Sequence, residues 1–169
     1  MKRKTKKKLI QILLFLVKFN LLAIPLYILI FLNFSLPPLQ NFVALLSHKL
    51  LSAIGIQSSL DQHNLIAIKE FKVFFVEISM DCTGWKSLYT LFALTIATPE
   101  VKIKRKFLFL LVSIPFLFFV NIGRIVLTIY LSLIEPESFA FVHDFLWQWG
   151  LILTIIGTWA LWLKLEKRI

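Results

Sequence analysis

Four long apolar runs constrain what this chain can fold into. They cover about residues 9–34, 82–99, 107–133 and 144–163. A helix needs about 20 apolar residues to cross the hydrocarbon core of a bilayer, and each run reaches or approaches that length. Hydrophobic residues make up 59% of the 169, more than a water-soluble domain of this size could bury. The sequence therefore predicts an all-α integral membrane protein: a single membrane domain over 1–169 with about four transmembrane helices.

Lysine and arginine are concentrated in three stretches, which set the orientation of the spans. These stretches read MKRKTKKK at the N-terminus, PEVKIKRK before the third run and KLEKRI in the tail. Cytoplasmic segments carry an excess of such residues, so both termini are expected in the cytoplasm and residues 35–80 outside. The first run is too long for a signal peptide and lacks a small-residue cleavage site, which favours a retained anchor. Because the basic residues flank apolar runs, the net charge of +10 indicates a multi-pass plasma-membrane protein rather than a nucleic-acid-binding one.

Residues 39–56 are apolar enough to be considered as a fifth span. Crossing would push the basic loop before the third run outside, and the segment also carries polar residues such as Gln40 and His48. Apolar residues recur at helical spacing. These are Leu39, Phe42, Val43, Leu46, Leu50 and Ile54. We therefore predict an interfacial helix on the outer leaflet, with a spanning helix as the alternative.

The next stretch, NLIAIKEFKVFFVEIS, is rich in β-branched and aromatic residues that partly alternate with polar ones. Such a pattern predicts strands rather than a helix. We expect two short strands at about residues 65–69 and 72–78, turning near Glu70. This extracytoplasmic β-hairpin would lead the chain to the membrane surface at Cys82.

Polar residues deep in the third run are the first indication of a functional site. Arg124 lies 17 residues after Phe107, which places it about 25 Å along a helix, in the outer third of the bilayer. Asn121, three residues earlier, lies on the same helix face. An intramembrane arginine is costly and usually functional. The alternative is a structural role, in which Arg124 snorkels outward or pairs with an acid such as Asp144.

The same topology places two further reactive residues near the outer surface. Cys82, the single cysteine, begins the second run, and His143 begins the fourth beside Asp144. Most single cysteines are small buried hydrophobes, and a histidine at a helix start can be an ordinary interfacial residue. Lys86 lies one helical turn after Cys82 and either supports the thiolate or merely snorkels. A site is favoured because the topology brings Cys82, Arg124 and His143 to one depth.

Thiol, guanidinium and imidazole together suit acyl transfer through a thioester. A thiolate is a strong nucleophile and is favoured by nearby cations. Histidine can accept and return a proton, and a fixed arginine can stabilise an oxyanion on the scissile carbonyl. The chain has no GxGxxG or phosphate-binding loop, and its three histidines lack a metal-binding spacing. We therefore expect no cofactor and no metal.

At these residues the sequence resembles the exosortase/archaeosortase family of integral membrane transpeptidases. The family is recognised by a cysteine in a C-[ST]-G context, an N-x-x-R motif and a third polar residue, often histidine, before the last helix. Here these read DCTGWKSL, NIGRI and HDFLWQWG, in that order, over about residues 60–163. The resemblance implies that Cys82 is the nucleophile, Arg124 the substrate-positioning or oxyanion-stabilising cation and His143 the acid/base partner.

The resemblance also implies a substrate class and an acceptor. Family members are thought to cut C-terminal sorting signals of exported proteins, each made of a short motif, a transmembrane helix and a basic cluster. They then transfer the protein to an acceptor, lipid-linked in archaeal members. Larger members have about twice as many spans as this chain. Two other functions stay open: a non-enzymatic scaffold subunit of a secretion or polysaccharide system, and an acyltransferase using His143 and Asp144.

Overall fold

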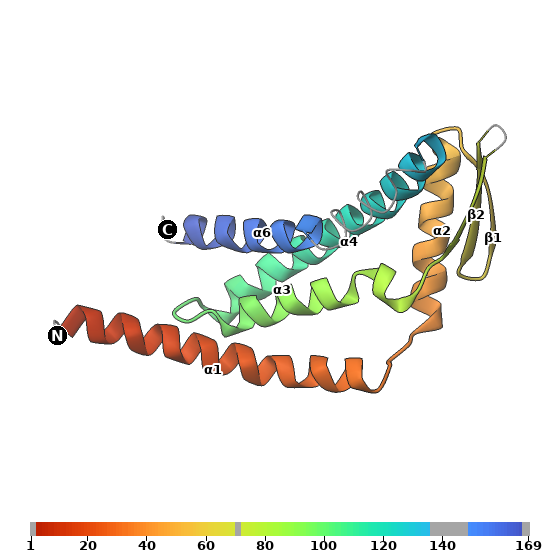
Figure 1. Cartoon of the computed structure of the whole chain (residues 1–169). Coiled ribbons are helices and arrows are strands. Elements are labelled where there is room, and N and C mark those ends of the chain that lie inside the picture. The colour runs from red at the N-terminus through yellow and green to blue at the C-terminus, as the bar shows by residue number, and fades with distance from the viewer. Residues whose placement is uncertain (1–2, 70–71, 136–148, 167–169) are drawn as a thin grey trace. The chain divides into compact units, whose positions relative to one another are not determined.

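The computed structural model describes residues 3–69, 72–135 and 149–166 (Figure 1). These residues belong to two compact units. The first comprises Met1–Phe34, Lys86–Pro115 and Ile155–Ile169, and the second comprises Ser35–Trp85 and Phe116–Thr154. Segments of the chain therefore alternate between the two units.

The first unit is helical. It contains α1 (Arg3–Phe31), most of α3 (Trp85–Ala97), the first part of α4 (Ile103–Ile134) and most of α6 (Leu151–Glu166).

Aromatic side chains join the helices of the first unit. Phe15 of α1 stacks on Trp159 of α6 with ring centroids 5.8 Å apart, and Phe109 of α4 stacks on Trp162 at 4.5 Å. The hydroxyl of Tyr89 on α3 donates a 2.8 Å hydrogen bond to the backbone carbonyl of Leu22 on α1. Offset aromatic pairs of this kind contribute about 0.5–1.5 kcal/mol beyond their buried area.

Ion pairs link the three basic stretches of the sequence at one end of this unit. Lys7 on α1 lies 3.5 Å from Glu100 in the α3–α4 connection. Arg105 at the start of α4 donates a 2.8 Å hydrogen bond to Glu166 at the end of α6. Both pairs are at least partly exposed, so each adds little stability. They show instead that the N-terminal, loop and C-terminal basic stretches lie together at one end of the unit.

Two helices in the described part of the chain are long and apolar enough to cross a membrane, over Thr5–Phe31 and Ile103–Ile134. They match the first and third predicted spans. With 13 residues, α3 is only about 20 Å long. Part of the predicted fourth span, 144–163, lies outside the described residues. The four-span count therefore stays a prediction.

The second unit is built on a three-stranded antiparallel sheet in the order β1-β2-β3. Its strands are β1 (Gln57–Asp61), β2 (Asn64–Lys69) and β3 (Lys72–Glu77). The predicted hairpin is confirmed in β2 and β3, which pair in register from Asn64↔Glu77 to Lys69↔Lys72. The prediction missed β1, whose sequence QSSLD has no β-branched or aromatic residue. It pairs with β2 across a tight turn in which Gln62 adopts φ 53°.

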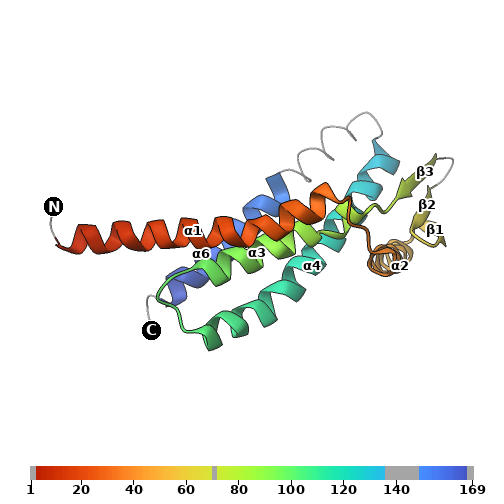
Figure 2. The ribbon, with the colours of Figure 1, turned by 90° about the horizontal axis from the view of Figure 1, so that it is seen from below.

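Helix α2 (Pro37–Ala53) packs along this sheet, beside β1 and β2 (Figure 2). Its predicted helical character is confirmed, although it ends three residues earlier than expected. The predicted apolar face was wrong in detail. Phe42, Leu50 and Ile54 are exposed, whereas the buried face consists of Gln40, Val43, Ala44, Ser47 and Leu51. The small residues Ala44 and Ser47 on the buried face allow a close approach of α2 to the sheet.

The core of the second unit joins α2, the sheet and the second part of α4. Its fully buried members include Val43 from α2, Leu65 and Ala67 from β2, and Ile122 and Ile129 from α4. Ile78, which follows β3, is also fully buried in this cluster. The chain around Cys82 is therefore anchored immediately upstream.

Candidate active site

Cys82 lies on a single turn of 3₁₀ helix, η1 (Met80–Thr83), between β3 and α3. Met80 and Thr83 point into the protein, whereas Cys82 is only half-buried. The turn is closed by hydrogen bonds from the Cys82 N–H to the Ser79 carbonyl (3.0 Å) and from the Thr83 hydroxyl to the Met80 carbonyl (2.7 Å). The buried side chains fix the turn, and Cys82 itself stays partly exposed.

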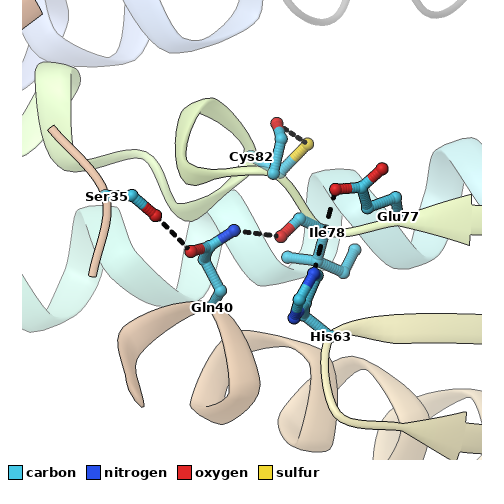
Figure 3. A network of polar contacts seen from close by, with 7 residues as sticks. Ser35, Gln40, His63, Glu77, Ile78 and Cys82 are labelled. Atoms are coloured by element: carbon cyan, nitrogen blue, oxygen red, sulfur yellow. Dashed lines mark hydrogen bonds and ion pairs between the residues drawn. The ribbon is translucent and has the colours of Figure 1, made fainter. Parts of the chain in front are cut away.

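The residues just before Cys82 are held by a polar network (Figure 3). Gln40 is buried on α2 and donates a 3.1 Å hydrogen bond from its side chain to the Ile78 carbonyl. Its side-chain oxygen accepts a hydrogen bond from the Ser35 hydroxyl at 3.0 Å. The Ser79 hydroxyl lies 3.4 Å from the Cys82 sulfur, within hydrogen-bonding distance. Buried polar side chains are normally paired in this way, and such pairing fixes backbone position.

Asn121 on α4 connects that helix to η1. Its side chain is 2% exposed and donates a 2.8 Å hydrogen bond to the Cys82 carbonyl. It also packs on Gly84, which adopts φ 75° directly after η1. A Cβ on Gly84 would lie 2.9 Å from Asn121 Cγ, closer than real contacts allow. The glycine of the C-[ST]-G motif is thus required both by its left-handed backbone and by the amide packed against it.

Arg124 lies one helical turn after Asn121 and lines a pocket of about 240 Å³ together with Cys82. Five consecutive residues, Phe74–Ile78, form the opposite wall, and the remaining lining is contributed by α4. Arg124 and Cys82 are close enough for charge on the sulfur to interact with the guanidinium. The second unit therefore brings together three of the residues singled out in the sequence: Cys82, Asn121 and Arg124.

The structure does not test the roles of three other predicted site residues, His143, Asp144 and Lys86. His143 and Asp144 lie outside the described residues. Lys86 is half-buried in the first turn of α3 and belongs to the first unit. Their assigned roles stay predictions.

Two pocket-side features were missed by the sequence reasoning. Glu77 lines the pocket, and its carboxylate lies 3.8 Å from the His63 imidazole, a pair also drawn in Figure 3. The second is the pair of contacts in which Gln40 donates to the Ile78 carbonyl and the Ser79 hydroxyl lies within hydrogen-bonding distance of the Cys82 sulfur. The available signal for Gln40 was its helical spacing from Val43, Ala44 and Ser47, which defines a face of mostly small or apolar residues. Within the described residues, no group of three or more His, Cys, Asp or Glu side chains could hold a metal ion.

One known protein family matches nearly the whole chain. The model for "Transmembrane exosortase" matches residues 5–164. The chain belongs to the transmembrane exosortase family. The match extends over both compact units and includes all three motifs noted in the sequence. Membership of the exosortase family and the two long apolar helices both support a membrane location. No curated protein and no solved structure matches it significantly.

Proposed function

We propose that this chain is a membrane-embedded cysteine transpeptidase that cleaves C-terminal sorting signals of exported proteins. The observation that carries the proposal is the shared pocket of Cys82 and Arg124, with the backbone of Cys82 fixed by Asn121. A half-buried thiol beside a cation, reachable from a pocket, has the environment of a reactive cysteine rather than of an inert core one. Family membership supports the same reaction class.

In the proposed reaction the Cys82 thiolate attacks the scissile carbonyl of the substrate. Arg124 stabilises the oxyanion that forms, because a fixed cation in a low-dielectric site acts most strongly on developing charge. The tetrahedral intermediate collapses to a thioester, and the departing amine leaves with a proton donated by His143. An incoming nucleophile on the acceptor, deprotonated by His143, then attacks the thioester, which releases Cys82 as the thiolate and leaves His143 protonated for the next cycle. Asn121 acts through Cys82 as a positioning residue, and Asp144 and Lys86 support the site.

The substrate is an exported protein ending in a short motif, a transmembrane helix and a basic tail, and the acceptor is lipid-linked. We place the enzyme in the plasma membrane with both termini cytoplasmic and the active site facing outside. The ion pairs that gather the three basic stretches at one end of the first unit support this orientation, because such stretches favour the cytoplasm.

Replacing the thiol tests the proposal. Cys82→Ala and Cys82→Ser are expected to abolish processing of a tailed reporter while membrane insertion is retained, as followed by immunoblotting of membrane fractions. Ser52→Ala, on the exposed face of α2, serves as the control and is expected to process normally. Wild-type processing by Cys82→Ala would refute the thiol mechanism and favour the scaffold function. Loss in His143→Ala with normal processing by Cys82→Ala would favour the acyltransferase.

A further inference from the structure

The open edge of β3 forms one wall of the pocket that contains Cys82. Within the described part of the chain, β3 pairs with β2 on one side and with no strand on the other. Its residues Phe74–Glu77, with Ile78, line the pocket, and η1 follows directly. The edge therefore runs toward the proposed nucleophile.

The register of the sheet identifies which backbone groups face this open edge. The Ile78 N–H donates to the His63 carbonyl at 2.9 Å, which makes these two residues a hydrogen-bonded pair. Such pairs alternate along an antiparallel ladder. Val73, Phe75 and Glu77 therefore direct their N–H and C=O groups away from β2. The Glu77 carbonyl accepts the Ser79 N–H at 3.0 Å, so the edge available for pairing ends there, just before the turn that carries Cys82.

The pocket lining suits an extended peptide. Phe75 is 72% exposed, and the lining contributed by α4 includes the buried apolar side chains of Ile125 and Ile129. Arg124 is the cation that complements a peptide carbonyl oxygen in these mainly apolar surroundings. The volume of about 240 Å³ falls below the usual 300–1,000 Å³ or so of a small-molecule site. Backbone pairing along an edge, with side chains entering adjacent pockets, is an established mode of peptide recognition.

We propose that the C-terminal segment of a substrate protein binds as an added β-strand along the open edge of β3, which carries its scissile carbonyl into the pocket between Cys82 and Arg124. This inference rests on the proposed function, because it assigns the substrate-binding mode of the same site. The row of backbone donors and acceptors that points away from β2 gives affinity for any extended chain, and the pocket selects the side chains beside the scissile bond.

Proline at position 75 tests the pairing. The N–H of Phe75 faces outward, so proline removes a donor from the edge without removing one from the β2–β3 ladder, and proline is tolerated on edge strands. Phe75→Ala is the matched control, since it removes the ring and keeps the N–H. We expect Phe75→Pro to process a tailed reporter about three- to tenfold more slowly than Phe75→Ala, the order of effect expected for one lost backbone hydrogen bond. Equal rates would overturn the proposal.

A proline scan of the reporter, with the wild-type enzyme, covers the case in which Phe75→Pro fails to fold. Successive prolines are placed in the extended segment beside the cleavage site. Because alternate N–H groups of an added strand face β3, inhibition is expected to recur at every second position. Inhibition without this period would overturn the added-strand arrangement.

A photo-crosslinking amino acid in place of Phe75, in a Cys82→Ala background, reports binding without chemistry. We expect it to capture the reporter. Capture of a second copy of the chain instead would mean that the edge is a dimer contact and would overturn the proposal.

The two proposals fail separately. If Cys82→Ala processes normally while Phe75→Pro does not, the thiol mechanism is wrong and strand addition stands. If Cys82→Ala is inactive while Phe75→Pro matches Phe75→Ala, strand addition is wrong and the thiol mechanism stands.

Discussion

The side-chain amide of Asn121 donates a 2.8 Å hydrogen bond to the backbone carbonyl of Cys82. These residues are 39 positions apart in the chain, yet this contact makes the position of the thiol depend on α4. Arg124, one turn further along the same helix, lines the same pocket. The N-x-x-R spacing thus has a structural meaning: one residue holds the backbone of the nucleophile, and the other places a cation beside it.

Asn121→Ala is expected to slow processing strongly while the thiol is retained. The substitution leaves the Cys82 carbonyl without its donor and opens a cavity, which should lower the free energy of unfolding by about 1–3 kcal/mol. Asn20→Ala is the matched control, because Asn20 makes a 2.8 Å amide-to-carbonyl bond within exposed α1. Reporter processing and thermal unfolding in detergent measure the two effects. Normal processing by Asn121→Ala would show that the hydrogen bond does not position the thiol.

Gly84→Ala is expected to be more harmful than Gly55→Ala. Both glycines have positive φ, 75° and 82°, so alanine carries a similar backbone cost of about 1–2 kcal/mol at each. A Cβ on Gly55 meets nothing within 4 Å, whereas one on Gly84 collides with Asn121. The difference in melting temperature between the two variants isolates that collision. Equal losses would mean that Asn121 moves aside without cost.

Arg124→Lys is expected to restore little of the activity lost in Arg124→Ala. A planar guanidinium can hold a carbonyl oxygen through two donors in a fixed geometry, which an ammonium cannot do. Initial rates of reporter processing compare the two variants at equal membrane abundance. Near-full turnover in the lysine variant would reduce the role of Arg124 to simple charge.

Thiol labelling tests the topology. Cys82 is the single cysteine of the chain, so a membrane-impermeant maleimide should label it slowly from outside intact cells. Ile103→Cys in a Cys82→Ala background should label only after the membrane is opened. Ile103 begins α4 and is 56% exposed, which makes that position accessible to the reagent. Labelling of Ile103→Cys from outside would indicate that residues 39–56 cross the membrane, and the sorting function would fall with that result.

Local patterns predicted those parts of the fold whose structure depends on local sequence. The β-branched and aromatic residues of β2 and β3 indicated strands, whereas β1 forms because β2 offers it an edge, which its polar sequence does not reveal. The exposed position of Phe42 on α2 has a similar origin. The buried face of that helix was selected by close packing and by the bond from Gln40 to Ile78, and neither can be derived from hydrophobic spacing.

The candidate site likewise contains residues that the sequence reveals and residues that only the structure reveals. Cys82, Asn121 and Arg124 could be found because reactive or charged residues stand out in apolar sequence. Ser79 and Glu77 are ordinary polar residues at the end of a strand, and only the tertiary structure brings them to the thiol or to its pocket.

Helix α1 is held in the first unit by the ring of Phe15, by the Lys7–Glu100 ion pair and by one main-chain contact. Tyr89 binds the main-chain carbonyl of Leu22 rather than a side chain, and most of the aliphatic residues of α1 are exposed. Exchange of one aliphatic residue for another along most of this helix should therefore be neutral, provided that hydropathy and the ring of Phe15 are kept. The sequences of homologues should therefore diverge most freely in α1. An alignment of this helix alone would be the least informative about which proteins are homologous.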